Sequence, residues 1–180
     1  MNMKEEMDSE KRECMKTLFV LDQKDYAEDM PTVERYAVRA LIQKNGLWAM
    51  QKSKLGEYKI PGGGVEEGES YREALIREVQ EETGLLVMED SIIEIGEILE
   101  IREDSYQKGT KYIAHSLCYF CDVKEEMTQS AMTENELARG YRLEWTDLDH
   151  AITCNEKIQT EMWTKRDTHF LKWLKEKGIR

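Results

Sequence analysis

Three glutamates, Glu78, Glu81 and Glu82, stand at positions i, i+3 and i+4 of one short segment. On a helix this spacing places all three carboxylates on one face. Like charges so arranged repel each other, so the cluster is either a solvated acidic face or a site for something positive. Clustered carboxylate oxygens are the hard ligands that Mg²⁺ and Mn²⁺ prefer.

A run of glycines, Gly62–Gly64, comes shortly before these glutamates. Glycine adopts backbone angles that are closed to other residues, so the main chain can turn sharply into a helix and approach a ligand closely. A backbone carbonyl there can join a coordination shell. Glu69 lies just before the expected helix and Arg77 two turns along it, so Arg77 can pair with Glu69 or Glu73 and hold that carboxylate in place.

The segment from Ser70 to Thr83 is predicted to be the helix that carries the glutamates, and Gly84 is a natural C-terminal stop. Apolar residues recur along it at helical spacing and can face a core. The glutamates lie beside this apolar stripe, at the edge of the core, where a cleft can form. The residues of the stripe are Tyr71, Leu75, Ile76 and Val79.

The elements around this helix are predicted to alternate between strands and helices. A helix is expected to begin at Thr146 or Asp147, and the tail from Asn155 onward is expected to be helical. The acidic stretch 124–140 is expected to be a surface loop. This order indicates a mixed α/β or α+β fold in one domain. Strands are expected at 17–22, 35–43, 47–52, 92–103, 111–123 and 141–145.

The spacing of nine residues between Gly63 and Leu85 resembles the complete Nudix box. The stretch reads Gly63, Glu69, and then Arg77-Glu78-Val79-x-Glu81-Glu82-x-Gly84-Leu85. The flanking segments RYAVRALIQ and LEWTDLDHAI also look like the family, so the resemblance covers residues 33 to 153. It implies a single-domain α/β/α sandwich around a mixed β-sheet. We expect an N-terminal extension at 1–30, the Nudix domain at 31–154 and a C-terminal helix at 155–180 packed on that domain.

The resemblance also implies a chemistry. It predicts a hydrolase that uses Mg²⁺ or Mn²⁺ to cleave a nucleoside diphosphate linked to another moiety, by in-line attack of water. The positions that match the family's metal ligands are Glu78, Glu81 and Glu82, together with the carbonyl of Gly63. Glu69 and Arg77 match the positions that brace the helix, and Arg77 is counted with the three glutamates in the catalytic set.

A general base from outside the box is less well defined by the sequence. Glu136 is favoured because TENELARG precedes the closing strand, and the alternatives are Glu97, Glu100, Glu125, Glu126 and Glu134. Substrate phosphates also need cations. Arg39, Arg102 and Lys111 are the expected substrate-binding residues, although each can equally be a solvent-facing charge.

The composition limits the choice of partner. A net charge of -11 over 180 residues argues against a basic nucleic-acid groove, and no apolar run reaches membrane-spanning length. The N-terminus lacks the apolar stretch of a signal peptide, so a cytoplasmic protein is expected. Cys118 and Cys121 are interpreted as plain thiols, because no second C-x-x-C pair completes a zinc site.

The substrate stays open at this stage. A small nucleotide is expected, such as a nucleoside triphosphate, an oxidised nucleotide or a nucleotide sugar. The alternatives are a non-catalytic nucleotide-sensing module and a pyrophosphohydrolase acting on the 5′ end of RNA. A homodimer is also left open.

Overall fold

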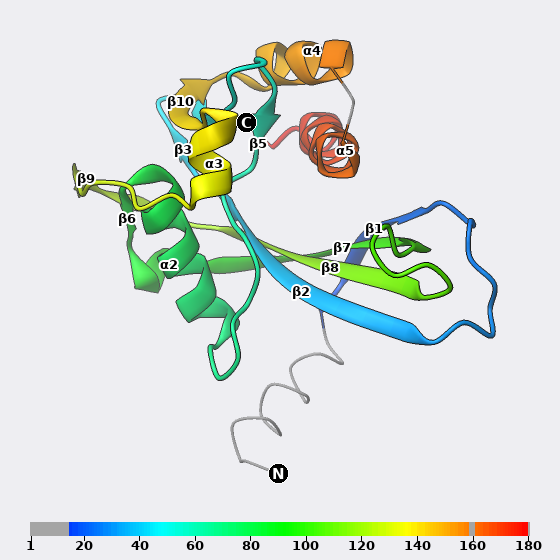
Figure 1. The fold of residues 1–180 in the computed structure, drawn as a ribbon. Coiled ribbons are helices and arrows are strands. Elements are labelled where there is room, and N and C mark those ends of the chain that lie inside the picture. Colours follow the sequence, from blue (N-terminus) through cyan, green and yellow to red (C-terminus); the bar gives the residue numbers. More distant parts are fainter. Residues whose placement is uncertain (1–14, 159–160, 180) are drawn as a thin grey trace.

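The computed structural model of the chain describes residues 15–158 and 161–179. Residues 1–14 of the expected N-terminal extension therefore lie outside the described residues. Helices cover both faces of a mixed sheet, and the acidic helix lies on the opposite face from the two C-terminal helices (Figure 1).

The first sheet has the strand order β1-β7-β8-β2. Its strands are β1 (Thr17–Asp22), β2 (Thr32–Leu41), β7 (Ile93–Glu103) and β8 (Lys111–Phe120). β1 runs parallel to β7, β7 antiparallel to β8, and β8 parallel to β2, so the sheet is mixed, as predicted. β1 lies within the segment that was expected to be an N-terminal extension, and it forms one edge of this sheet.

The glycine-rich loop lies along the other edge, against β2. The N–H of Val38 donates to the carbonyl of Gly63 at 2.9 Å, and the N–H of Ala40 donates to the carbonyl of Pro61 at 2.8 Å. The loop therefore continues the sheet by one short strand-like segment. This pairing fixes where the main chain turns toward the acidic helix.

Smaller sheets flank the first one. β4 (Leu47–Lys52) pairs with β10 (Arg142–Thr146), β3 (Gln43–Lys44) and β5 (Tyr58–Lys59), all antiparallel. β6 (Leu85–Val87) pairs with β9 (Val123–Met127), and a 3₁₀ turn at Glu89–Ser91 follows β6.

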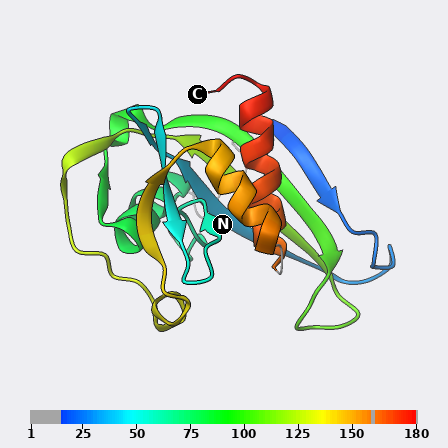
Figure 2. The ribbon, with the colours of Figure 1, turned by 90° about the horizontal axis from the view of Figure 1, so that it is seen from above.

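Four α-helices complete the described fold: α2 (Tyr71–Thr83), α3 (Glu134–Arg139), α4 (Leu148–Ile158) and α5 (Met162–Glu176). α2 packs on one face of the first sheet, where Leu75 and Val79 meet Val38 and Leu117. α4 and α5 lie side by side over the other face (Figure 2), and Phe170 and Leu171 bury the sheet residue Cys118 there. The predicted α/β/α arrangement in a single domain is confirmed.

Both ends of α2 are set by its sequence. The Ser70 side chain accepts a hydrogen bond from the N–H of Glu73, and the Glu73 side chain accepts one from the N–H of Ser70, which forms a reciprocal capping box. At the other end Gly84 has φ +74°, and a Cβ there would lie 2.3 Å from the carbonyl oxygen of Thr128. The predicted helix and its glycine stop are confirmed.

The predicted strands all have counterparts, but the prediction of a surface loop over 124–140 is wrong. That stretch contains most of β9 and all of α3. β9 depends on a distant partner, β6, which local patterning does not reveal. α3 begins with a Thr133 capping box that is closed by Glu136. Among the helices that the structure describes, none is long and apolar enough to cross a membrane.

Candidate functional site

Arg77 lies at the centre of the site and makes five hydrogen bonds, one for each of its guanidinium N–H groups. Its Nε and Nη2 donate to the two carboxylate oxygens of Glu69 at 2.7 and 2.9 Å, which is a bidentate pair. Nη2 also donates to the carbonyl of Gly64 at 3.0 Å, and Nη1 donates to Glu78 at 2.8 Å and to Glu81 at 3.3 Å. The hydrogen bonds with Glu69 raise the pKa of Arg77 and hold the pKa of Glu69 below its usual range. Arg77 thus connects the helix to the loop.

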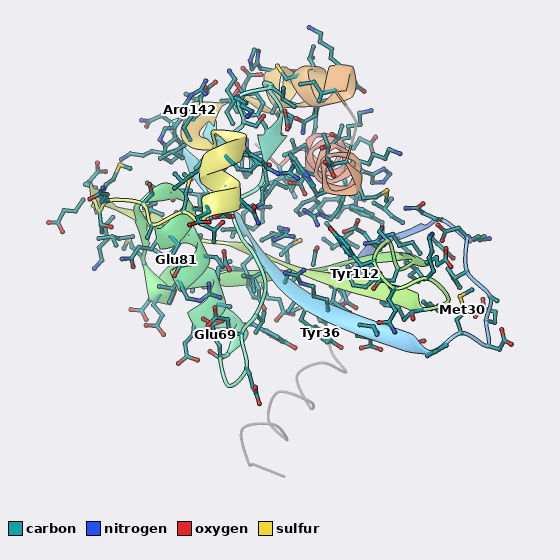
Figure 3. All side chains as sticks on the ribbon, viewed as in Figure 1. Met30, Tyr36, Glu69, Glu81, Tyr112 and Arg142 are labelled. Carbon is teal, nitrogen blue, oxygen red and sulfur yellow. The ribbon has the colours of Figure 1, made fainter. Side chains whose placement is uncertain are left out.

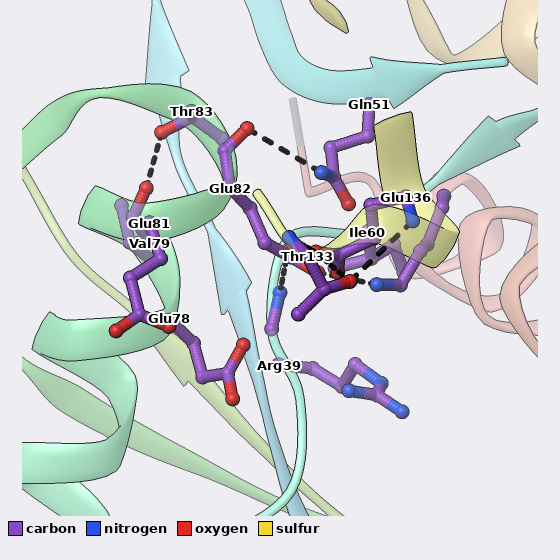
Figure 4. Close-up of polar contacts among 12 residues, drawn as sticks. Arg39, Gln51, Ile60, Glu78, Val79, Glu81, Glu82, Thr83, Thr133 and Glu136 are labelled. Atoms are coloured by element: carbon purple, nitrogen blue, oxygen red, sulfur yellow. Dashed lines mark hydrogen bonds and ion pairs between the residues drawn. The ribbon is translucent and has the colours of Figure 1, made fainter. Parts of the chain in front are cut away.

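Glu82 is the most deeply buried of the three glutamates, with a side chain that is 1% exposed. Lys59 forms an ion pair with one of its oxygens, and the N–H of Gly62 donates to the other at 2.7 Å. Gln51 lies beside it, and its Nε2 donates to the main-chain carbonyl of Glu82 at 3.4 Å (Figure 4). With the Gln51 amide turned over, its nitrogen donates instead to Glu82 Oε2 at 3.0 Å. Burial raises the pKa of Glu82 to about 7, although Lys59 and the Gly62 N–H act in the opposite direction.

Glu78 and Glu81 have different surroundings. The Glu78 side chain is 14% exposed and lies against the α-carbon of Gly63, where a Cβ would come within 2.4 Å of Glu78 Oε2. Glu81 is 43% exposed and faces an open groove of about 730 Å³ beside α2. Glu66, Glu69 and Arg77 also line this groove. In Figure 3, Glu69 and Glu81 lie at α2, away from the distal end of the sheet where Tyr112 lies.

The donor set fits a hard divalent cation. It offers three carboxylates on one turn of helix, and only a glycine at position 63 lets the main chain approach Glu78 so closely. The Gly63 carbonyl already accepts the Val38 N–H, so its second lone pair is the one left for a metal. Within 15–158 and 161–179, no three His, Cys, Asp or Glu side chains converge as a ready-made metal group. In this conformation the carboxylates are instead held by Arg77 and Lys59.

The structure separates the six candidates for an outside base. Glu136, on α3, is close enough to Glu82 and Lys59 for both to act on its pKa. Burial raises the pKa of Glu136, but hydrogen bonds from the Thr133 N–H and hydroxyl, both at 2.8 Å, lower it together with Lys59 and Glu82. The pKa of Glu136 therefore lies below its usual range. The others lie elsewhere: Glu97 bonds His115, Glu100 bonds Arg166, Glu125 pairs with Lys44, and Glu126 and Glu134 are exposed.

The three expected phosphate-binding cations are not brought together. Arg39 is buried among the site residues, where burial and then Arg166 lower its pKa to about 10. Its Nη1 donates to the Val38 carbonyl, and its buried Nε has no hydrogen-bond partner among the described residues. Arg39 pairs with Cys118 of β8, whereas Arg102 pairs with Tyr112 of the same strand. Cys118 and Tyr112 are six residues apart, so the two arginines are separated by about 20 Å along β8.

Lys111 is equally remote from Arg39. It forms an ion pair with Glu28 at 3.1 Å and lies 4.3 Å above the centre of the Tyr26 ring. Arg102 lies 4.5 Å from the centre of the Tyr112 ring. Of the three cations, the structure therefore places only Arg39 beside the glutamates.

Sequence reasoning missed the partners of Glu82, which are Lys59, Gln51 and the Gly62 N–H. Lys59 immediately precedes Ile-Pro-Gly-Gly, and a basic residue at the entry to a glycine loop was the available indication. Gln51 gave none, because it comes from β4 and meets Glu82 only through the packing of the fold. The contacts that hold Glu82 are thus mostly tertiary.

Comparisons with known proteins agree with this geometry. The family model described as NUDIX domain matches residues 33–174. An uncharacterized Nudix hydrolase, YvcI of Bacillus subtilis (strain 168), is 28% identical over 100 residues, which are 56% of this chain and 57% of that protein. The chain thus spans little more than half the length of this curated relative.

Two solved structures are similar to the chain. A NUDIX hydrolase from Nitrosomonas europaea has a TM-score of 0.54 and 21% identity, with 76% of this chain and 89% of that chain covered. The E. coli ORF135 protein has a TM-score of 0.47 and 23% identity, over 71% and 82% of the two chains. The first of these supports the fold.

Proposed function

The chain belongs to the Nudix family, and we propose that it is a metal-dependent pyrophosphohydrolase that cleaves a nucleoside diphosphate linked to another moiety. The observation that carries the proposal is the complete set of box contacts. Arg77 ties the helix to Glu69 and Gly64, and Glu82 is bonded at both of its oxygens. These contacts keep the three carboxylates at one edge of the core, where Glu81 faces an open groove.

We assign the following roles to the residues of the site. Glu78, Glu81 and Glu82, with the Gly63 carbonyl, would hold Mg²⁺ or Mn²⁺. When bound, such an ion would neutralise phosphate charge and lower the pKa of a water molecule. Arg77 and Glu69 fix the helix against the loop, so that the carboxylates keep their positions. Arg39 binds a substrate phosphate, because it is a buried cation whose Nε is unpartnered among the described residues.

We propose Glu136 as the residue that orients the attacking water and takes its proton. It comes from α3, outside the box, and is the candidate that borders Glu82. Hydrogen bonds from the N–H and hydroxyl of Thr133 orient the Glu136 carboxylate and restrict the rotamers of its side chain. A Glu136→Gln variant keeps most of the volume of the side chain and removes its basicity.

The test is a screen of small nucleotides. Nucleoside triphosphates, oxidised nucleotides, nucleotide sugars and dinucleoside polyphosphates are incubated with the full chain and Mg²⁺ or Mn²⁺. Release of phosphate is followed in the presence of inorganic pyrophosphatase or a phosphomonoesterase. The proposal expects turnover of at least one compound, and loss of that turnover when the metal is chelated.

Glu82→Gln is the decisive variant, and Glu125→Gln is its matched control. Glu125 is 86% exposed and forms an ion pair with Lys44, which lies outside the box. We expect Glu82→Gln to lower turnover by about a hundredfold or more and Glu125→Gln to leave it unchanged. Unchanged turnover in Glu82→Gln contradicts the proposal. Nucleotide binding without turnover would favour a sensing module, and turnover confined to triphosphorylated RNA would favour the RNA substrate.

A further inference from the structure

The short segment that leads into the glycine loop is held by side chains of the C-terminal helices. Asn155, on α4, is fully buried and bonds both backbone groups of Tyr58. Its Oδ1 accepts from the Tyr58 N–H at 2.7 Å, and its Nδ2 donates to the Tyr58 carbonyl at 2.9 Å. These two hydrogen bonds fix the backbone of Tyr58, in β5, through both its N–H and its carbonyl.

Asp167, on α5, holds the same segment two residues further on. Its Oδ2 accepts from the Ile60 N–H at 2.9 Å, and its side chain is 1% exposed. Arg166 orients this carboxylate by bonding its Oδ1 at 2.8 Å, and Arg166 also bonds Glu100 of β7 at 3.1 Å. Asp167 thus lies in a buried ion network that is joined to the loop by the hydrogen bond from the Ile60 N–H.

Between and beyond these two anchors, the segment provides the groups that hold Glu82. Lys59 lies between Tyr58 and Ile60, and its side chain forms the ion pair with Glu82. The N–H of Gly62 follows two residues after Ile60 and bonds the other oxygen of Glu82. Pro61 lies between Ile60 and Gly62, and its ring fixes one backbone angle of this short connection.

We propose that Asn155 and Asp167 are positioning residues of the site, which set the place of the Glu82 carboxylate through residues 58–62. In the described part of the chain, neither side chain has a hydrogen bond or ion pair with Glu82. The C-terminal helices α4 and α5 thereby belong to the site, although they lie outside the box. A test of this proposal by turnover rests on the proposed function, whereas tests by amide hydrogen exchange and by metal affinity do not.

The competing explanation is that Asp167 only stabilises α5. Glu100→Gln is the matched control for it, because Glu100 also pairs with Arg166 but, among the described residues, has no hydrogen bond or ion pair with residues 58–62. Asp167→Ala removes the acceptor for the Ile60 N–H. Asp167→Asn removes the charge but keeps an oxygen that can accept this bond.

The experiment compares these variants of the full chain by hydrogen exchange of the Ile60 and Gly62 amides, by Mn²⁺ affinity and by steady-state kinetics. In Asp167→Ala we expect both amides to exchange about tenfold faster and Mn²⁺ to bind about fivefold more weakly. We expect kcat to fall about thirtyfold, with KM within about threefold of wild type. Asp167→Asn should recover most of each effect, and Glu100→Gln should remain within about threefold of wild type throughout.

Several results would overturn the inference. One is an exchange rate at Gly62 in Asp167→Ala no faster than in Glu100→Gln; another is an Asp167→Asn variant as impaired as Asp167→Ala. If Asp167→Ala does not fold, Asn155→Ala makes the same comparison from α4, with the same expected changes at Gly62. If the wild type hydrolyses nothing in the screen, the proposed function fails, while amide exchange and Mn²⁺ affinity still decide the positioning role.

Discussion

Alanine substitutions at two adjacent glycines, Gly62 and Gly63, should have different effects on stability and activity. At Gly62, φ is +136° and an added Cβ would lie 2.1 Å from the carbonyl oxygen of Val38 and 2.9 Å from its carbonyl carbon. These are backbone atoms of β2 that cannot move aside. At Gly63 the three atoms nearest to the Cβ would all belong to the Glu78 carboxylate, the first at 2.4 Å, and this is the far end of a flexible side chain.

The costs can be estimated from these contacts. In Gly62→Ala the loop has to leave the edge of β2, which breaks two backbone hydrogen bonds worth about 1 kcal/mol each. The unfavourable backbone angle adds about 1–3 kcal/mol. The loss of about 3–5 kcal/mol corresponds to a fall in Tm of about 10 °C for a chain of this size. In Gly63→Ala the Glu78 carboxylate swings away from Arg77, at a cost of about 1 kcal/mol and about 3 °C.

The two variants should therefore separate stability from activity. Thermal unfolding followed by circular dichroism measures Tm, and Mn²⁺ affinity and turnover measure the site at a temperature where both variants are folded. Gly63→Ala should unfold within a few degrees of wild type but lose about tenfold or more in Mn²⁺ affinity or turnover, because Glu78 is displaced. Equal losses of Tm in the two variants, or a Gly62→Ala variant as stable as wild type, would refute this steric reasoning.

Three further outcomes are expected. Arg77→Lys should lower turnover by about tenfold or more and the free energy of unfolding by about 1–2 kcal/mol, because lysine cannot make the bidentate pair with Glu69 and also reach Gly64; kinetics and urea denaturation measure both. The free energy of unfolding should fall as the pH drops below about 4.5. The reason is that Arg77 lowers the pKa of Glu69 in the folded state, so the stability that this ion pair contributes is lost as Glu69 becomes protonated. Denaturation measured from about pH 6 to 3 tests this, because the free energy of unfolding should depend less steeply on pH in Glu69→Gln. Cys118 and Cys121, whose pKa values burial raises to about 12, should resist alkylation at pH 8 until urea unfolds the chain, as mass spectrometry of the alkylated protein would show.

Local patterns in the sequence predicted the parts of the site that are local in the structure. The i, i+3, i+4 spacing places the glutamates on one face of α2, and the pairing of Arg77 with Glu69 spans only eight residues. The capping box at Thr133 was also readable, because Thr-x-x-Glu is a helix-start pattern, yet the acidic composition of 124–140 favoured a loop. β9 could not be predicted in this way, since a short exposed strand is specified by the partner with which it pairs.

The three glutamates look equivalent in the sequence but are unequal in the fold. Their side chains are 14%, 43% and 1% exposed for Glu78, Glu81 and Glu82, and only the last is removed from water almost completely. Helical spacing determines which residues share a face, but it does not determine which of them a neighbouring layer covers. That cover comes from β4 and from the loop after β5, and the C-terminal helices fix this loop through two buried polar side chains. A carboxylate surrounded in this way keeps one position, whereas an exposed one such as Glu81 can move. The fold therefore supplies what the box pattern lacks, which is a rigid reference point for the rest of the site.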